Sequence, residues 1–433
     1  MLKDGPMKKI FIIVLLFILV GLSLPKYIGG IVDTEHQAAM DKVNDNPAIT
    51  VNSSTFIQHW FGGQAVTEMT LLLGDEELGG ITIIIEEQLS FGPIIYTAEG
   101  LQLALSHSQA KINFKELAID EEISHFINDK VQLSGLLTFS RDIVARLVID
   151  EITKEVDGNK VASAKAEGHF TIENDTRLYG DFTWAGLKAT TSDKSFTLGE
   201  TTFSLDQTLI SGDYYQGNAI SIGEFEFLLA SISSTDDKGK TTLSLSNLLA
   251  KAKSTVSKDL MTVKMNYSID KFESDGQQFE HANLDINFND LNIKVMQELN
   301  NLMTQSTGND TAEFTSENMA VLSQLTDKLL ADEPVVEIQD FSVDTPEGKI
   351  ESSMKVSADK QLFDTTNIMS IMAAIKANAN GKAPERFFAK LGLTPMIEMY
   401  IEQGLLMKID NDLRFKAHLS QGQLEVNGQV LPL

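Results

Sequence analysis

Residues capable of acid–base or nucleophilic chemistry are spread along this chain, and their spacing matches few known sites. His59 stands beside Trp60, where it could act as a ligand or a base, but no partner nucleophile is evident nearby. An aromatic segment followed by Gly62 and Gly63 more readily forms a packing anchor and a turn. None of the seven histidines belongs to an H-E-x-x-H or other paired metal-ligand pattern. They are His36, His59, His107, His125, His169, His281 and His418.

Two serine–lysine pairs have the spacing used in acyl transfer, namely Ser108 with Lys111 and Ser352 with Lys355. That chemistry places the serine and the lysine on adjacent turns of a helix. Both pairs here lie in alternating, strand-like sequence, and no Lys-Thr-Gly element accompanies them. The spacing is therefore interpreted as coincidence.

Acidic clusters could bind a hard cation, but consecutive acids point to different sides of the chain and more often mark solvated loops or edges. The stretch Asp285-x-Asn287-x-Asn289 begins like a calcium loop, yet Asp290 replaces the required glycine and Met296 replaces the final glutamate. We predict no metal site, no cofactor and no catalytic residue. The acidic clusters are Asp75-Glu76-Glu77, Glu86-Glu87 and Asp120-Glu121-Glu122.

Composition limits the classes of function. The chain of 433 residues has 61 acidic and 35 basic side chains, for a formal net charge of −26. Acidity of this size repels nucleic acid at long range, so no nucleic-acid partner is expected. The absence of cysteine excludes a disulfide framework and thiolate chemistry.

An uncharged apolar run near the start decides where the rest of the chain is expected to lie. It extends from Ile10 through Leu16 to Leu24, follows Lys8-Lys9, and is not followed by a good cleavage site. We therefore predict an uncleaved signal anchor, with a cleaved signal peptide and a buried core segment as the alternatives. This predicts one membrane-spanning helix with the lysines on the cytoplasmic side and the C-terminal bulk exported. Residues 1–32 would form a short cytoplasmic segment and the anchor, and residues 33–433 the exported region.

The exported region shows mainly the two-residue period of β-strands. Apolar residues from Met261 to Ile269 alternate with polar ones, as do those from Leu284 to Phe288 and from Leu413 to Leu419. Turn sequences such as Pro346-Glu347-Gly348-Lys349 separate such runs. A change of phase at Gly223-Glu224 indicates a β-bulge or a short turn.

Helical periods appear in the second half, where Leu291, Val295, Leu299 and Leu302 share one stripe. A second stripe begins at Met319, and Thr394 is expected to cap a third helix. The predicted fold is a β-rich α+β fold in which an N-terminal transmembrane helix precedes an elongated, mainly antiparallel, many-stranded sheet with packing helices in the second half. A division into domains is possible near 305–310.

Several motifs in order resemble one known family. The anchor is followed by Tyr27-Ile28-Gly29-Gly30 and then by the segment Phe56 to Ala65. The stretch Phe279 to Val295 and the ending Gly422 to Gly428 add to the likeness. Together they resemble the YdgA-like family of bacterial inner-membrane-anchored periplasmic proteins, whose biochemical function is unassigned. The resemblance implies that the predicted helix crosses a bacterial inner membrane once and that residues 33–433 form a periplasmic region. The segment departs from the family pattern at Gln58-His59 and Gly62-Gly63, which argues against a reactive site there.

The sequence therefore predicts a non-enzymatic envelope protein with a structural or interaction role. Its partners would be the inner membrane, through one helix, and a lipid or an envelope protein. The alternative is that an apolar groove of the sheet binds or transfers a hydrophobic ligand such as a lipid. A periplasmic hydrolase is a third possibility, because the separation of an acid pair is set by the fold.

Overall fold

The computed structural model describes residues 6–72, 80–97, 100–115, 130–156, 158–274, 276–307, 316–363, 370 and 373–431. These residues form two compact units. Unit 1 contains residues 1–151, 165–182 and 212–219, and unit 2 contains residues 152–164, 183–211 and 220–433.

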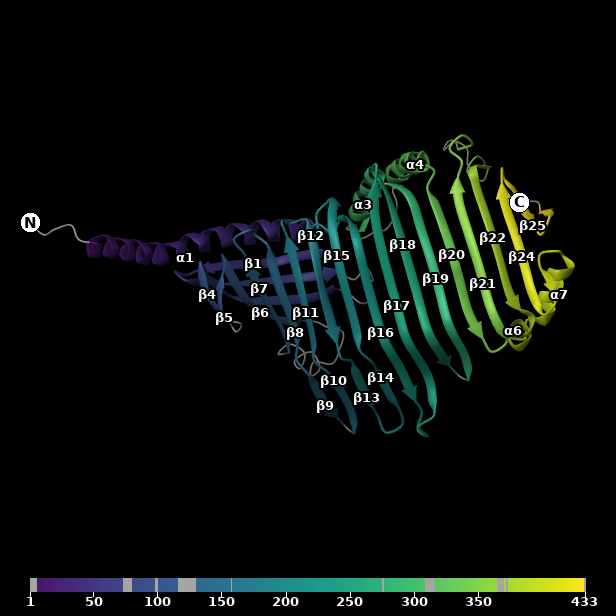
Figure 1. Cartoon of the computed structure of the whole chain (residues 1–433), viewed down its shortest axis with the longest axis horizontal. Coiled ribbons are helices and arrows are strands. Elements are labelled where there is room, and N and C mark those ends of the chain that lie inside the picture. The colour runs from purple at the N-terminus through teal and green to yellow at the C-terminus, as the bar shows by residue number, and fades with distance from the viewer. Residues whose placement is uncertain are drawn as a thin grey trace, which may run out of the picture. The chain divides into compact units, whose positions relative to one another are not determined.

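Unit 1 is an antiparallel sheet with one long helix, α1 (Figure 1). Its strands pair in the order β1, β2, β3, β6, β7, β8 and β11, and β4 and β5 form a separate hairpin. The elements are α1 (Pro6–Asn44), β1 (Ile49–Gln58), β2 (Gly62–Leu72), β3 (Gly80–Phe91), β4 (Ile94–Thr97), β5 (Gly100–Leu103), β6 (Ser106–Lys115), β7 (Val131–Leu137), β8 (Ile143–Ile149) and β11 (Ala166–Glu173). Strand β12 (Arg177–Trp184) begins in unit 1 and ends in unit 2.

The core of unit 1 lies where α1 packs against one face of this sheet. Ile28 and Val32, one helical turn apart, are buried against Phe91. Leu24 packs against the same cluster. The apolar residues after Leu24, which the sequence places next to the anchor, thus hold α1 to the sheet.

The predicted anchor falls mostly outside the described side chains. Among the residues whose placement is described, no helix is long and apolar enough to cross a membrane. Ile10 and Leu16 belong to α1, but their side chains lie outside the described residues. The anchor and the boundary at residue 32 therefore stay predictions.

The described strands of both units other than β4 and β5 belong to one 24-stranded sheet. Unit 2 consists mainly of antiparallel strands, most of which pair with the next strand along the chain (Figure 1). Its strands are β9 (Ile152–Val156), β10 (Asn159–Ser163), β13 (Leu187–Thr190), β14 (Ser195–Leu198), β15 (Thr201–Ser211), β16 (Ile220–Thr235), β17 (Thr241–Ser257), β18 (Leu260–Ser274), β19 (Gln277–Asn292), β20 (Val335–Thr345), β21 (Gly348–Ala358), β22 (Ile375–Pro384), β23 (Met407–Ile409), β24 (Asp412–Ser420), β25 (Gln423–Val426) and β26 (Gln429–Leu431). Its helices are α3 (Ile293–Thr307), α4 (Ser316–Leu330), α6 (Glu385–Lys390) and α7 (Thr394–Glu402).

The structure confirms a β-rich fold with a many-stranded antiparallel sheet. The alternating runs predicted from the sequence are strands β18, β19 and β24, and the predicted turn at Pro346 joins β20 to β21. Helices α3 and α4 pack their apolar stripes against each other, through Val295 and Leu302 on α3 and Leu325 on α4. The predicted helices are therefore packing helices.

Three local predictions are wrong. The register of β16 continues unbroken through Gly223, so there is no bulge there, although Gly223 has a positive φ of 145°. Leu291 belongs to strand β19 rather than to the helical stripe. Thr394 is the first residue of α7, and Leu393 occupies the N-cap without a side-chain hydrogen bond.

The predicted domain division near 305–310 falls at the end of α3 and, from residue 308, outside the described residues. It stays a prediction.

Candidate functional site

His59 lies on the exposed turn between β1 and β2, where its backbone N–H donates to the carbonyl oxygen of Gly62 at 2.8 Å. The neighbouring Trp60 donates its indole N–H to the carbonyl oxygen of Leu22 at 2.6 Å. Gln58 donates to the carbonyl oxygen of Lys26, also at 2.6 Å. This segment therefore forms a turn that holds α1, as its aromatic and glycine residues suggest.

The two serine–lysine pairs lie on strands. Ser108 and Lys111 belong to β6, and Ser352 and Lys355 to β21, so members of a pair three residues apart point to opposite faces of the sheet. Neither pair can meet as the acylation chemistry requires.

The acidic clusters are also separated by strand geometry. Glu86 and Glu87 occupy opposite faces of β3. Asp285 and Asn287 lie inside strand β19, so this stretch is not a calcium loop, and Asp285 accepts a hydrogen bond from Asn266 at 2.6 Å. The clusters at 75–77 and 120–122 lie outside the described residues. Within the described residues, no three histidine, aspartate or glutamate side chains lie close enough to hold a metal ion.

A polar group that the sequence did not reveal lies under α1. Glu87 accepts a hydrogen bond from Ser108, and burial raises the pKa of its carboxyl. The Nε2 of His36 is 3.9 Å from the Glu87 carboxylate, too far for a hydrogen bond. Burial lowers the pKa of His36, so the ring is uncharged near neutral pH, and we do not regard the two as an ion pair. Because α1 covers these groups, they face the core rather than a cleft.

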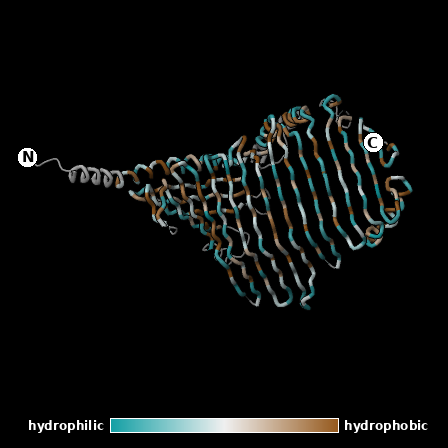
Figure 2. Tube along the Cα trace, in the orientation of Figure 1, coloured by the Kyte–Doolittle hydropathy of each residue, from teal (hydrophilic) through white to brown (hydrophobic). Residues whose placement is uncertain are grey.

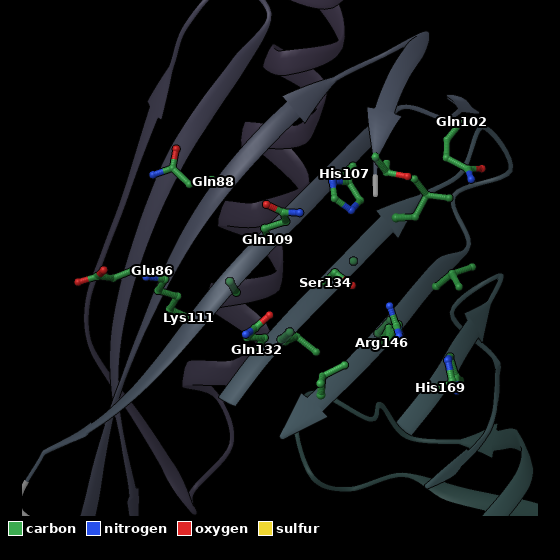
Figure 3. Close-up of a pocket in the computed structure, with 18 residues that line it drawn as sticks. Glu86, Gln88, Gln102, His107, Gln109, Lys111, Gln132, Ser134, Arg146 and His169 are labelled. Atoms are coloured by element: carbon green, nitrogen blue, oxygen red, sulfur yellow. The ribbon is translucent and has the colours of Figure 1, made fainter. Parts of the chain in front are cut away.

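A polar pocket of about 640 Å³ lies on the opposite face of the unit 1 sheet (Figure 3). Strands β3, β6, β7, β8 and β11 supply its floor, and Gln102 of the β4–β5 hairpin lies at its edge. Arg146 donates to Glu167 at 2.8 Å, and His169 lies 3.5 Å from the same carboxylate. The hydrogen bond from Arg146 lowers the pKa of Glu167. Because these charges are paired and partly exposed, the pocket has the character of a solvated sheet face.

The most distinctive surface is one face of the unit 2 sheet. Cross-strand register aligns its apolar residues into rows that run across nine strands, from β15 to β22 and then β24. The central row contains Leu205, Phe225, Ala252, Met265, Ile286, Ile338, Met354, Ala379 and Ala417.

Parallel rows flank the central one. The row on one side includes Val263, Phe288, Val336 and Val356, and the row on the other includes Phe227, Tyr267, Leu284 and Phe341. We call these three rows the apolar face. Eight spacings of about 4.8 Å make it roughly 38 Å wide.

The opposite face of the same strands is strongly polar. Lys264 and Asn266 flank Met265 along β18, and Glu337 precedes Ile338 on β20. Lys253 forms an ion pair of 2.6 Å with Glu224 across strands β16 and β17. Alternation of hydrophobic and polar residues along the strands is visible in Figure 2. Each strand thus has one side suited to water and one suited to an apolar medium.

The residues of the apolar face remain partly accessible. Phe225, Tyr267 and Phe341 are 37, 40 and 41% exposed, and no residue of the central row from Leu205 to Ala417 is fully buried. Helices α3 and α4 lie near one end of the strands (Figure 1) and direct their apolar stripes at each other. The described helices of unit 2 therefore do not bury this face.

Sequence periodicity predicted some strands of this face, among them β18, β19 and β24, each one separately. The alignment of the rows depends on cross-strand register, which one strand's pattern does not specify. The accessibility of the apolar face depends on where the helices of unit 2 pack, which the strand sequences do not specify either. Only the combination of these features turns ordinary amphipathic strands into a continuous surface.

Comparison with curated proteins and with solved structures found no match. One family model matches residues 7–433, which is nearly the whole chain. The protein therefore belongs to the family described as bacterial protein of unknown function (DUF945).

Proposed function

We propose that the protein is a non-enzymatic binding protein whose apolar face holds the acyl chains of a lipid or a similar amphiphile. The observation that carries this proposal is the continuous, partly exposed apolar face on the sheet of unit 2. Exposed apolar patches larger than a few hundred Å² mark interaction sites on soluble proteins. At roughly 38 Å, the face exceeds the length of one acyl chain, about 15 Å or half of a bilayer core.

The chemistry of the face favours hydrocarbon over a protein partner. Its central row contains no charged side chain and no nitrogen or oxygen atom in a side chain, and the Met265 sulfur accepts only a weak hydrogen bond from the Tyr267 hydroxyl at 3.6 Å. Protein interfaces form about one hydrogen bond per 100–200 Å² and have a polar rim. The small side chains of Ala252, Ala379 and Ala417 interrupt the larger residues of the row. A hydrocarbon needs no hydrogen bonds, so this surface matches its requirements.

We further propose that the apolar run from Ile10 to Leu24 anchors the protein in the bacterial inner membrane, with the sheet on the periplasmic side. Support comes from Lys8-Lys9 before the run and from the resemblance to YdgA-like proteins. An anchored binding protein would take its ligand from, or deliver it to, a nearby membrane.

Photo-crosslinking of the full chain with a diazirine derivative of palmitic acid tests the binding proposal. The expected adducts map by mass spectrometry to the apolar face. A variant carrying Met265→Gln and Ile338→Gln should lose several-fold in adduct yield, because two amides enter the central row. The matched control, Lys264→Gln with Glu337→Gln, places the same side chains on the same strands but on the polar face, and should retain the wild-type yield.

Equal losses in both variants, or adducts spread over both faces, would contradict specific binding. A concentration-dependent dimer that excludes the probe would assign the face to a second copy of the chain instead. Both variants should keep a wild-type unfolding midpoint. A loss of about 2–5 kcal/mol in Met265→Gln with Ile338→Gln alone would show that the face is a covered core.

A further inference from the structure

The β4–β5 hairpin of unit 1 presents large apolar side chains to solvent. Ile94 pairs with Leu103 and Tyr96 pairs with Leu101, so all four side chains lie on one face of the two-stranded ribbon. They are 64, 71, 82 and 73% exposed, respectively. The other face is directed inward, where Ile95 and Ala104 are buried. Four exposed apolar side chains that adjoin one another on one small element are typical of an interaction site.

A second exposed group lies close to the turn of α1 that contains Leu22. Tyr27, Trp60 and Phe61 are all more than half exposed. The Trp60 indole bonds to the backbone of Leu22, so the aromatic pair at the β1–β2 turn is fixed beside the helix. The Phe61 carbonyl oxygen accepts the backbone N–H of Phe91 at 2.8 Å, which links this turn to the strand that leads into the hairpin.

Both groups border the same part of α1. The hairpin leaves the sheet after Phe91 and rejoins it at Leu105, and both residues pack in the cluster that contains Leu24 and Ile28. Figure 1 shows β4 and β5 at the end of the unit 1 sheet from which the N-terminal half of α1 extends. The sequence of that half is the apolar run that ends at Leu24. The exposed groups therefore lie at the end of the unit 1 sheet from which the helix extends.

We infer that this surface, formed by Ile94, Tyr96, Leu101 and Leu103 of the hairpin together with Tyr27, Trp60 and Phe61, contacts the lipid bilayer. This inference rests on the proposed membrane anchorage of α1. We name it the bilayer-contact surface. Tyrosine and tryptophan favour the membrane–water interface, because their rings are apolar while their polar groups stay hydrated. The aliphatic side chains of the hairpin would enter the outer part of the acyl region.

A bilayer is favoured over a protein partner because of continuity with the anchor. A helix that emerges from the membrane near Leu24 brings the membrane surface to the residues around that point. Leu22 and Tyr27 lie within one turn of it, at a rise of about 1.5 Å per residue. The surface would fix unit 1 against the membrane, so that α1 would not act as a free tether.

The cysteine-free sequence permits a direct test on the full chain. Single cysteines introduced as Leu101→Cys and Tyr96→Cys would carry the fluorophore NBD, and the protein would be reconstituted into phosphatidylcholine–phosphatidylglycerol vesicles. The matched control is Gln88→Cys, on the exposed polar face of β3 in the same unit. We expect blue-shifted emission at 96 and 101 and quenching by doxyl-labelled phosphatidylcholine, with neither effect at 88.

Flotation of the same vesicles reports anchorage separately. Protein that floats but shows water-like emission at 96 and 101 would overturn the bilayer contact and leave the anchor intact. Blue-shifted emission without doxyl quenching would assign the bilayer-contact surface to a protein partner or a second copy of the chain. That result would also overturn the inference of bilayer contact. Protein that does not float would remove the anchorage and, with it, the bilayer contact.

Discussion

At the scale of single residues, burial between α1 and the sheet shifts the pKa of Glu87 on β3 and the pKa of His36 on α1. The raised pKa of Glu87 means that the folded state holds a proton more tightly than the unfolded state. Folding stability therefore falls as pH rises from the ordinary glutamate value, 4.5, through the folded pKa, and the penalty is fully present above that range.

We predict that Glu87→Gln stabilises the protein at pH 7–8, because the buried charge is removed while the amide oxygen still accepts from Ser108. The gain should shrink as the pH falls toward 4.5. Urea unfolding at several pH values measures it. Glu86→Gln, on the exposed side of the same strand, should change the free energy of unfolding by less than about 0.5 kcal/mol at every pH. A pH-independent effect of Glu87→Gln would refute the buried-charge explanation.

His36 changes folding stability with pH in the direction opposite to that of Glu87. Because burial lowers its pKa, the unfolded state gains a proton below pH 6.5 that the folded state resists. This contribution to stability therefore decreases as the pH falls from 6.5 toward the folded pKa. The contact of the ring with Phe56, at a centroid distance of 5.5 Å, keeps it under α1 in the neutral form.

The sequence was sufficient to argue against several kinds of catalytic or metal site. It did not indicate which polar side chains from different elements would contact one another. The strand-like pattern around Ser108 correctly argued against pairing with Lys111. Nothing in it indicated that Ser108 would bond to Glu87, 21 positions away, under a helix that brings His36 beside them. Such a group depends on register between strands and on helix docking, and both are properties of tertiary structure.

At the scale of elements, the docking of α1 depends on a close approach at Gly29. A Cβ there would meet the ring of Phe91 at 2.6 Å and the side-chain amide of Gln58. The Gln58 amide could move, but Phe91 is buried in the core cluster and could not do so easily. The adjacent Gly30 has no heavy atom within 4 Å of the same position. The two glycines thus lie on different sides of the helix.

We predict that Gly29→Ala destabilises unit 1 by about 1–3 kcal/mol through overpacking. Gly30→Ala should stabilise it by up to about 1 kcal/mol, since alanine favours the helix. Denaturant titration of the two variants measures both effects. Equal effects of the same sign would mean that α1 does not pack on the sheet through Gly29.

The elements themselves were largely predictable, and their ends were not. Met261 to Ile269 lie within β18 because their two-residue period is long and unbroken. Leu291 appeared to continue the stripe of α3, but backbone pairing with Met261 keeps it in β19. Where a residue fits both a helical and a strand period, pairing with the neighbouring strand determines which element it joins. The sequence of one segment does not show which strand it will pair with.

At the scale of the whole molecule, neither unit is a continuous piece of chain. Unit 1 needs residues 165–182 to supply β11, which pairs with β8 from Ile149 to Ile143. It also needs residues 212–219, where Asp213 forms an ion pair of 3.0 Å with Lys42 of α1. Cutting the chain at residue 151 would remove both.

We predict that a fragment of residues 6–151 is less stable than unit 1 in the full chain and self-associates, because β8 becomes an unpaired edge. Loss of the ion pair between Lys42 and Asp213 lowers the free energy of unfolding of the fragment by a further amount of about 1 kcal/mol at most. Size-exclusion chromatography and limited proteolysis measure the outcome. A fragment of residues 6–182, which keeps β11, should associate less. A monomeric, protease-resistant 6–151 fragment would show that β11 is dispensable.

Strands β15 to β22 pair mainly with their neighbours along the chain, and this pairing determines how the width of the apolar face can vary. Each of these strands touches mainly the strands before and after it, so local stability resembles a sum of nearest-neighbour terms, as in repeat proteins. Low contact order of this kind lets a hairpin form by zippering onto an existing edge. Insertion or deletion of one hairpin would then lengthen or shorten the apolar face by about 10 Å without changing its alternation of apolar and polar residues. The architecture is in that sense extensible, and the width of the apolar face can change in steps of two strands.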